Sequence, residues 1–338
     1  MGTRHLVIDS FGFRLGLQGL RVSVRNSENG TIKEFPLSRL KTVTISSDGI
    51  SISTDLLKVL GIRGIPVFMV DYKGEVVSLL SGPNFHGTAK IRQHQFKTLE
   101  DSSHSYSLAK SVLTTKIKNQ KAVLSYFQKY LKKSEKGGLE RLSRAIESLH
   151  VQSTQLSEEL NIPIDSFEWR PYLLGIEGYS AKVYWEALIQ SELLPKSFLG
   201  RMGRGATDPV NQALNYGYGI LSSQVWRAIS IAGLEAYSGF LHTDRPGKPS
   251  LVLDLMEEYR PWLVDRQVIK LRSELSRVSS ITPLIRRKII SSIQKSLRSE
   301  VVSYSRRILL ETLIQRQVFR FSGSICEKKS YRGHVFKW

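Results

Sequence analysis

The sequence predicts an α+β protein, with a small β-rich N-terminal domain and a larger all-α C-terminal domain that carries the functional site. Apolar and polar residues alternate over residues 1–80, whereas apolar residues recur at helical spacing from residue 88 onward. A stretch with glycine and proline, SGPNFHG at 81–87, separates the two patterns and predicts a linker. The chain of 338 residues is long enough for the two domains, 1–80 and 88–338, to have their own cores.

The N-terminal domain is predicted to consist of short strands and one helix. Five strands are indicated by RHLVIDS, FRLGLQ, LRVSVRN, TIKEFP and TVTISS, and tight turns between them by ENG and SDG. The next segment, STDLLKVLGIRG, predicts a helix because it has a Ser-Thr-Asp start and a glycine stop. Two further strands are indicated by IPVFMVD and EVVSLL.

The C-terminal domain is predicted to be helical throughout. Helical spacing of apolar residues is seen in AKIRQHQFKTLED, in the run from Ser107 to Leu131, in EGYSAKVYWEALIQSEL and in PVNQALNYGYGILSSQVWRAISIAGL. Two loops, GRMGRGATD at 200–208 and HTDRPGKPS at 242–250, mix glycine with Arg or Lys. Such loops suit contacts to phosphates, and solvated linkers are an equal alternative.

The charge of the chain is unevenly distributed, with a formal net value of +19. Residues 90–150 hold 13 Lys and Arg against five Asp and Glu, and residues 265–338 hold 17 against five. Between them, residues 151–264 hold nine against 13. A polyanion partner explains the basic segments better than a solvated surface, because cationic proteins gain affinity by releasing counterions from phosphates. An acidic segment between them indicates a metal ion, since carboxylates otherwise repel phosphate.

Several functional classes are poorly supported. The single cysteine, Cys326, excludes an internal disulfide and a cysteine-built metal site. The sequence has no P-loop, dinucleotide-binding fingerprint, G-x-S-x-G or H-E-x-x-H pattern, so nucleotide hydrolysis, hydride transfer, esterase and zinc-peptidase activities are not indicated. No apolar run is long enough for a bilayer and no signal-peptide layout is present, so we expect a cytoplasmic protein without a membrane partner.

The stretch SLVLDLMEEYRPWLVDR at 250–266 is predicted to form one helix with a buried apolar stripe. Three acids, Asp254, Glu257 and Glu258, lie within one turn of one another and are expected to crowd one flank of that helix. Like charges at this spacing repel. The flank therefore either faces water or accommodates a cation.

Two further residues are candidate metal ligands. Glu177 lies between Gly175 and Gly178 at an expected helix start, where the helix dipole alone would favour an acid. His242 lies twelve residues before Asp254, and a lone histidine of this kind is more often structural. One imidazole with several carboxylates suits Mg²⁺ or Mn²⁺, and the nitrogen favours Mn²⁺. Such an ion among phosphate-binding segments indicates phosphodiester chemistry.

The sequence resembles the CRISPR-associated integrases of spacer acquisition, the "Cas one" family, and is most similar to archaeal members. The most specific matches are GIEGYSAKVYWEAL at 175–188, DPVNQALNYGYGIL at 208–221, and His242 with the LVLDLMEEYRPWLVDR block. KIKNQKAVL and IRQHQF match more weakly. These motifs occur in the family's order and spacing over nearly the whole chain, behind a small β domain.

The resemblance implies a β-rich domain that mediates homodimerisation and a helical domain that holds one divalent ion per protomer. It assigns the catalytic and metal-binding roles to Glu177, His242 and Glu257, with Asp254 and Glu258 as nearby support. Many members have Asp where this chain has Glu257. The helix pattern alone places Glu258 closer to the flank of Asp254, so the choice between the adjacent glutamates follows the resemblance.

The implied activity is that of an Mn²⁺- or Mg²⁺-dependent DNA integrase and endonuclease. A 3′-hydroxyl of a captured DNA fragment, the spacer, would attack a phosphodiester of the CRISPR repeat array, and the same site would cleave or resolve branched DNA. The alternatives are a DNA-repair nuclease for branched DNA and a non-catalytic DNA-binding scaffold.

The implied partners are double-stranded, branched and repeat DNA, a second copy of the chain, and the small ferredoxin-like second CRISPR adaptation subunit. The basic loops and clusters supply candidate contacts to the DNA backbone. These candidates are Arg201, Arg204, Arg245, Lys248, Arg286, Arg287, Lys288, Arg306 and Arg307.

Overall fold

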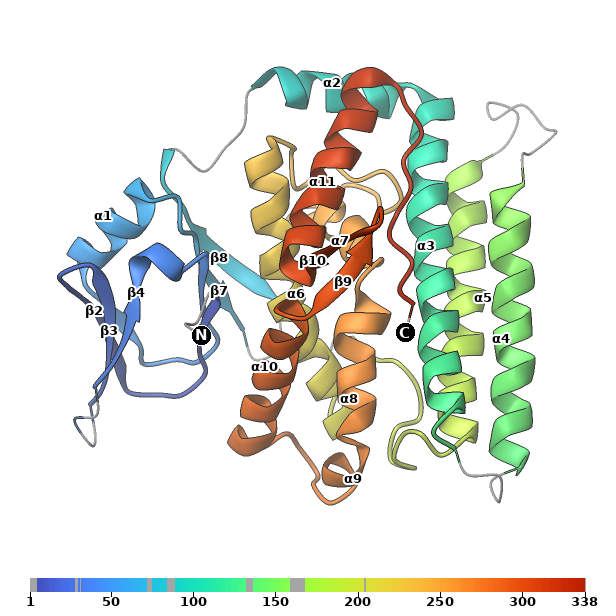
Figure 1. Cartoon of the computed structure of the whole chain (residues 1–338), viewed down its shortest axis with the longest axis horizontal. Helices are drawn as coiled ribbons and strands as arrows, with labels where there is room; N and C mark the ends of the chain where they lie inside the picture. The colour runs from blue at the N-terminus through green and yellow to red at the C-terminus, as the bar shows by residue number, and fades with distance from the viewer. Residues whose placement is uncertain are drawn as a thin grey trace.

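The computed structural model describes residues 5–27, 30, 32–71, 75–83, 89–131, 136–158, 168–203 and 205–337. A β-rich N-terminal region precedes a mostly helical C-terminal region, which confirms the predicted fold class (Figure 1). Most of the predicted linker falls outside the described residues, so the domain boundaries 1–80, 81–87 and 88–338 stay predictions. Among the described helices, none combines the length and the apolarity that crossing a membrane requires.

The N-terminal region contains two four-stranded sheets. In the first sheet the order is β1-β5-β7-β8, with β1, β5 and β7 parallel and β8 antiparallel to β7. In the second the order is β4-β3-β2-β6, with β6 parallel to β2 and the other pairs antiparallel. The elements are β1 (His5–Ile8), β2 (Phe13–Gln18), β3 (Arg21–Asn26), β4 (Ile32–Pro36), η1 (Leu37–Arg39), β5 (Thr42–Ile45), β6 (Ser51–Ile52), α1 (Thr54–Ile62), β7 (Val67–Val70) and β8 (Val76–Leu80). Apolar residues of both sheets and of α1 share one core.

The C-terminal region is built around α6. Figure 1 shows α3, α4 and α5 side by side along one side of the molecule, with α6, α10 and α11 between them and the sheets. The helices are α2 (Ala89–Glu100), α3 (Ser102–Gln128), α4 (Lys136–Ser157), α5 (Trp169–Gln190), α6 (Pro209–Ala232), α7 (Ser250–Met256), the π-helical η4 (Arg260–Asp265), α8 (Arg266–Lys270), α9 (Arg272–Leu275), α10 (Pro283–Leu297) and α11 (Leu310–Glu327).

Helix α6 shows why these residues form a rigid central element. The Asp208 side chain accepts a hydrogen bond from the Asn211 N–H and caps the helix, and Pro209 begins the first turn. The helix ends at Gly233, whose φ of 81° is accessible to glycine without strain. Nearly every residue between them is buried, so α6 is the core helix against which α7, α10 and α11 pack.

Three expectations from the sequence are corrected by the structure. The C-terminal region is not entirely helical, because β9 (Glu300–Ser303) and β10 (Arg306–Leu309) form an antiparallel hairpin. The β-branched residues of EVVS and RRIL favour this hairpin over a helix. Residues 250–266 do not form one helix: α7 ends at Met256, and Pro261, which has no N–H, lies in the π-helical segment η4. Glu177 lies in the middle of α5 rather than at a helix start.

Candidate metal centre

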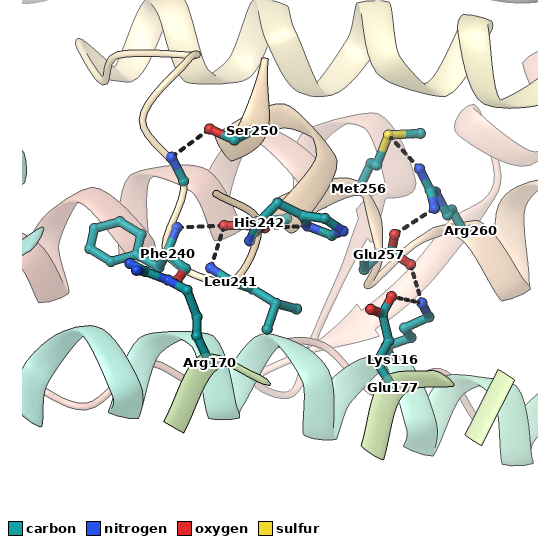
Figure 2. Close-up of polar contacts among 12 residues, drawn as sticks. Lys116, Arg170, Glu177, Phe240, Leu241, His242, Ser250, Met256, Glu257 and Arg260 are labelled. Carbon is teal, nitrogen blue, oxygen red and sulfur yellow. Dashed lines mark hydrogen bonds and ion pairs between the residues drawn. The ribbon is translucent and has the colours of Figure 1, made fainter. Parts of the chain in front are cut away.

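Glu177, His242 and Glu257 come together although they lie on three different elements. Glu177 projects from α5, His242 lies in the loop between α6 and α7, and Glu257 is the residue directly after α7. One ligand atom from each side chain lies within 4.8 Å of the others. Figure 2 shows the three side chains directed toward a common point, with Lys116 and Arg260 beside them. An imidazole and two carboxylates at this separation suit a divalent cation.

Asp254 holds His242 in place. Its carboxylate accepts hydrogen bonds from the backbone N–H groups of Phe240, Leu241 and His242 at 2.6, 2.9 and 2.9 Å. The Nδ1–H of His242 donates a fourth hydrogen bond to the same carboxylate at 2.7 Å. The Nε2 atom is therefore free to act as a ligand, in the arrangement common to metal-bound histidines. Gly239 permits this close approach, since a Cβ there would lie 2.7 Å from the Asp254 carboxylate.

The charges around His242 determine its protonation. Burial alone lowers the pKa of His242, but the hydrogen bond and charge of Asp254, together with Glu257 and Glu177, raise it above its ordinary value. Three carboxylates thus surround one imidazole. A cation bound among them competes with the proton on that ring, so metal binding and protonation oppose each other.

Glu257 is buried, with a relative exposure of 1%, and is surrounded by cations. Lys116 Nζ lies 2.7 Å from its Oε2, and Arg260 Nη1 lies 2.5 Å from its Oε1. Burial opposes ionisation, yet the charges of Arg260 and Lys116 lower the pKa of Glu257 to about 2. Each oxygen of this ionised carboxylate is thus contacted by one cation, Oε2 by Lys116 and Oε1 by Arg260.

Glu258 is directed away from this cluster. Its Oε1 accepts a hydrogen bond from the Tyr331 hydroxyl at 2.6 Å, and burial raises the pKa of Glu258 to about 7. The helix pattern that placed Glu258 on the flank of Asp254 is wrong, because the α-helical repeat ends at Met256. The structure brings Glu257, and not Glu258, to Glu177 and His242.

The C-terminal tail supports the turn that follows Glu257. Asn119 Nδ2 donates to the carbonyl oxygens of Glu258 and His334, and Asn119 Oδ1 accepts from the Phe336 N–H. The Phe336 ring stacks on Trp262 with a centroid distance of 5.1 Å. The C-terminal tail is therefore attached to α3 through Asn119 and packs on Trp262 of η4.

The two carboxylates and the imidazole have the chemistry of a divalent-ion site. Comparisons with known proteins identify the family of the chain. A family model described as "CRISPR associated protein Cas1" matches residues 6–277. The chain belongs to the Cas1 family. The resemblance to this family is thereby confirmed.

Curated members of the Cas1 family match the chain from end to end. A "CRISPR-associated endonuclease Cas1 1" of Francisella tularensis subsp. novicida (strain U112) is 40% identical over 335 residues, covering 99% of this chain and 100% of the relative. A protein of the same name from the archaeon Archaeoglobus fulgidus is 33% identical over 351 residues, covering 98% and 99%. The family therefore includes full-length bacterial and archaeal relatives of this chain.

Solved structures show the same fold at lower identity. A casposase bound to integration product superposes with a TM-score of 0.80 at 21% identity, covering 99% of this chain and 95% of that chain. A chain of a Cas6-RT-Cas1--Cas2 complex superposes with a TM-score of 0.75 at 20% identity, covering 99% of this chain and 36% of that chain. These superpositions show that the chain shares its fold with these two proteins.

The basic candidates of this Cas1 chain differ in their surroundings. Arg201 is engaged internally, since its guanidinium donates to Asn211 and Asn215 and lies over the Tyr218 ring. Lys288 pairs with Glu274. Arg204 lies outside the described residues. The exposed candidates are Arg245, Lys248, Arg287, Arg306 and Arg307, and the half-buried one is Arg286. Arg245 and Lys248 lie in the loop that begins at His242.

Two cations at the centre were missed by the sequence reasoning. Lys116 and Arg260 contact the candidate ligands directly, yet neither was singled out. A signal for Lys116 was present, because Lys116 and Asn119 are polar residues one turn apart in the apolar helix α3. Arg260 lies three residues after Glu257, at a spacing that favours an ion pair.

Asp265 supports this arrangement and predicts a pH dependence of stability. The Tyr218 hydroxyl donates to Asp265 at 2.5 Å, and Arg260 lies over the Tyr218 ring. Burial raises the pKa of Asp265 from 3.8 to about 7. Between these pH values the folded protein retains a proton that the unfolded chain has lost, so the free energy of unfolding falls as pH rises through this window.

We expect Asp265→Asn to remove this dependence. The asparagine is uncharged at every pH, so the variant lacks a decline of up to about 4 kcal/mol between pH 4 and 7. Urea unfolding of wild type and variant across this range measures the difference. Asp48→Asn, at an exposed site, is the control. Parallel pH profiles for wild type and Asp265→Asn would contradict the assignment.

Proposed function

We propose that this protein is an Mn²⁺- or Mg²⁺-dependent DNA integrase and endonuclease that inserts captured DNA fragments into a CRISPR repeat array. The observation that carries the proposal is the convergence of Glu177, His242 and Glu257 within 4.8 Å. Membership of the Cas1 family and relatives named as endonucleases support it. The shared fold with a casposase bound to integration product is consistent with it.

The side chains of the candidate site would bind the divalent ion and keep its ligands oriented. The Glu177 and Glu257 carboxylates and His242 Nε2 would bind the ion. Asp254 keeps the imidazole oriented through its four hydrogen bonds, and Arg260 restrains Glu257 from its other oxygen. When bound, the divalent ion supplies Lewis-acid stabilisation of charge on the phosphate oxygens.

The proposed reaction is a direct transesterification. The 3′-hydroxyl oxygen of the incoming fragment forms one P–O bond while one P–O bond of the repeat strand breaks, so no energy source is required. The hydroxyl loses its proton, and the displaced 3′-oxygen of the repeat gains one. Water in place of the hydroxyl gives hydrolysis of branched DNA at the same site. The nucleophile comes from DNA or water, so no activated Ser, Tyr or Cys is needed.

DNA and two protein partners belong to the proposal. The exposed Arg245 and Lys248 on the loop after His242, and Arg306 and Arg307 on β10, are the proposed contacts to DNA phosphates. The fold shared with a chain of a Cas6-RT-Cas1--Cas2 complex supports the small ferredoxin-like adaptation subunit as a partner. Homodimerisation through the β-rich domain is proposed from the family resemblance.

A strand-joining assay tests the proposed function. A branched DNA that carries a labelled 3′-hydroxyl flap is incubated with wild type or Glu177→Gln in Mn²⁺, Mg²⁺ or EDTA. We expect joined product with wild type in metal, and none in EDTA or with Glu177→Gln. The control is Glu186→Gln, an exposed position two and a half turns along the same helix, which should join DNA like wild type.

Two other outcomes would identify the alternatives. Cut but unjoined strands, without preference for a repeat substrate, would favour a DNA-repair nuclease. DNA binding that survives EDTA with no strand chemistry in any metal would favour a non-catalytic scaffold, and the enzymatic proposal would then be withdrawn.

A further inference from the structure

Lys116 lies inside the cluster of candidate ligands. Its Nζ is 2.6 Å from Glu177 Oε1 and 2.7 Å from Glu257 Oε2, so one ammonium bridges two of the three side chains (Figure 2). It reaches them from α3, which packs against α5 and α7. The side chain is only 10% exposed. A cation with so little water around it depends on these two carboxylates for its stabilisation.

The Lys116 ammonium offsets the repulsion between the Glu177 and Glu257 carboxylates when no metal ion is bound. Glu177 and Glu257 come within a few ångströms of each other beside Asp254, and unpaired carboxylates in a poorly hydrated site repel strongly. Arg260 neutralises Glu257 from its Oε1 side only. Lys116 supplies the positive charge on the side where Glu177 and Glu257 meet. The ammonium thus stands where a divalent ion would find its carboxylate oxygens.

We propose that Lys116 is a built-in cation that competes with the divalent metal ion for Glu177 and Glu257. The inference rests on the proposed function, because it takes these residues as ligands. Without metal, Lys116 keeps the two carboxylates together and the site assembled. Metal binding requires its ammonium to withdraw, which the flexible four-carbon side chain permits. Arg260 contacts the other oxygen of Glu257 and does not have to leave.

The proposal predicts the sign of an effect on metal affinity. Removing a competitor strengthens metal binding, whereas removing a residue that merely holds the ligands in position weakens it. Coupling between two ligands of one protein typically changes affinity by about 5- to 150-fold. We therefore expect Lys116→Met to bind Mn²⁺ at least about 5-fold more tightly than wild type.

Calorimetric titration of the full-length protein with MnCl₂ is the experiment. Wild type, Lys116→Met, Lys116→Gln and Lys118→Met are compared. Lys118 is two residues along α3 and reaches Ser157 on α4 instead of the cluster, so its variant should bind Mn²⁺ like wild type. Unfolding temperatures supply a second measurement. Lys116→Met should melt below wild type in EDTA and gain more from Mn²⁺, because its carboxylates repel until the ion arrives.

The outcomes separate this inference from the proposed function. Mn²⁺ binding by wild type, with weaker or equal binding by both Lys116 variants, would overturn the competition and leave the metal site standing. Binding by the Lys116 variants and none by wild type would support it in its strongest form. Absence of binding by all four folded proteins would overturn the metal site itself, and the inference with it.

Discussion

Glu257→Gln is expected to abolish Mn²⁺ binding and DNA strand joining, whereas Glu258→Gln should leave Mn²⁺ affinity close to that of wild type. Glu257 faces Glu177 and His242, while Glu258 accepts a hydrogen bond from Tyr331 on the other side of the turn. Loss of residues that only support a metal ligand already costs about 10- to 100-fold in affinity, so loss of a ligand should cost more than about 100-fold. Calorimetric titration and the strand-joining assay measure both effects.

The two adjacent substitutions are matched in residue type and burial, which makes each a control for disturbance of the turn. Both replace a buried carboxyl group with an amide of the same shape, and only Glu257 is ionised throughout the neutral range. Similar losses in both variants would point to a general disturbance of the turn. A larger loss in Glu258→Gln would contradict the assignment of Glu257.

Asp254→Asn is expected to weaken both folding and metal binding. The Asp254 carboxylate accepts four N–H hydrogen bonds. The side-chain NH₂ of an asparagine would face some of these N–H donors and could not accept from them. Hydrogen bonds to a charged acceptor contribute about 1.5–3 kcal/mol each, so the free energy of unfolding should fall by about 3 kcal/mol or more. The Mn²⁺ affinity should fall by about 10- to 100-fold, because His242 loses its orientation.

Urea unfolding and Mn²⁺ titration check the two parts of this prediction separately. Asp244→Asn is the control, since Asp244 is exposed on the same loop two residues after His242. A variant that loses stability but retains wild-type Mn²⁺ affinity would show that His242 does not need Asp254 to act as a ligand. An unchanged free energy of unfolding would show that the four hydrogen bonds to the Asp254 carboxylate do not stabilise the fold.

Much of the fold could be predicted because its causes are local. The alternation in RHLVIDS and FRLGLQ yields β1 and β2, and Asp208-Pro209 at one end and Gly233 at the other mark α6. The hairpin β9–β10 was missed because its short apolar runs fit a helix as well as a strand when read alone. The break after Met256 was missed because the apolar stripe continues through it, although Pro261 was visible in the sequence.

The candidate site depends on distances that no local pattern encodes. Glu177 and His242 are 65 residues apart. They meet because α3 packs against both α5 and α7, and Asp254 on α7 holds His242. Their residue types made them candidate ligands, and the family resemblance assigned them the metal-binding role. Periodicity would have selected Glu258 over Glu257, since it assumes a continuous helix. Lys116 and Arg260 were not predicted, because the basic candidates came from glycine-containing loops and clusters of Arg and Lys, whereas these two residues lie in segments with an apolar helical pattern.

The most direct test of the metal centre is anomalous X-ray diffraction at the manganese edge from crystals soaked in MnCl₂. We expect one strong peak per protomer, between the side chains of Glu177, His242 and Glu257. Manganese peaks elsewhere in the crystal, with none between these three side chains, would contradict the assignment of the metal centre.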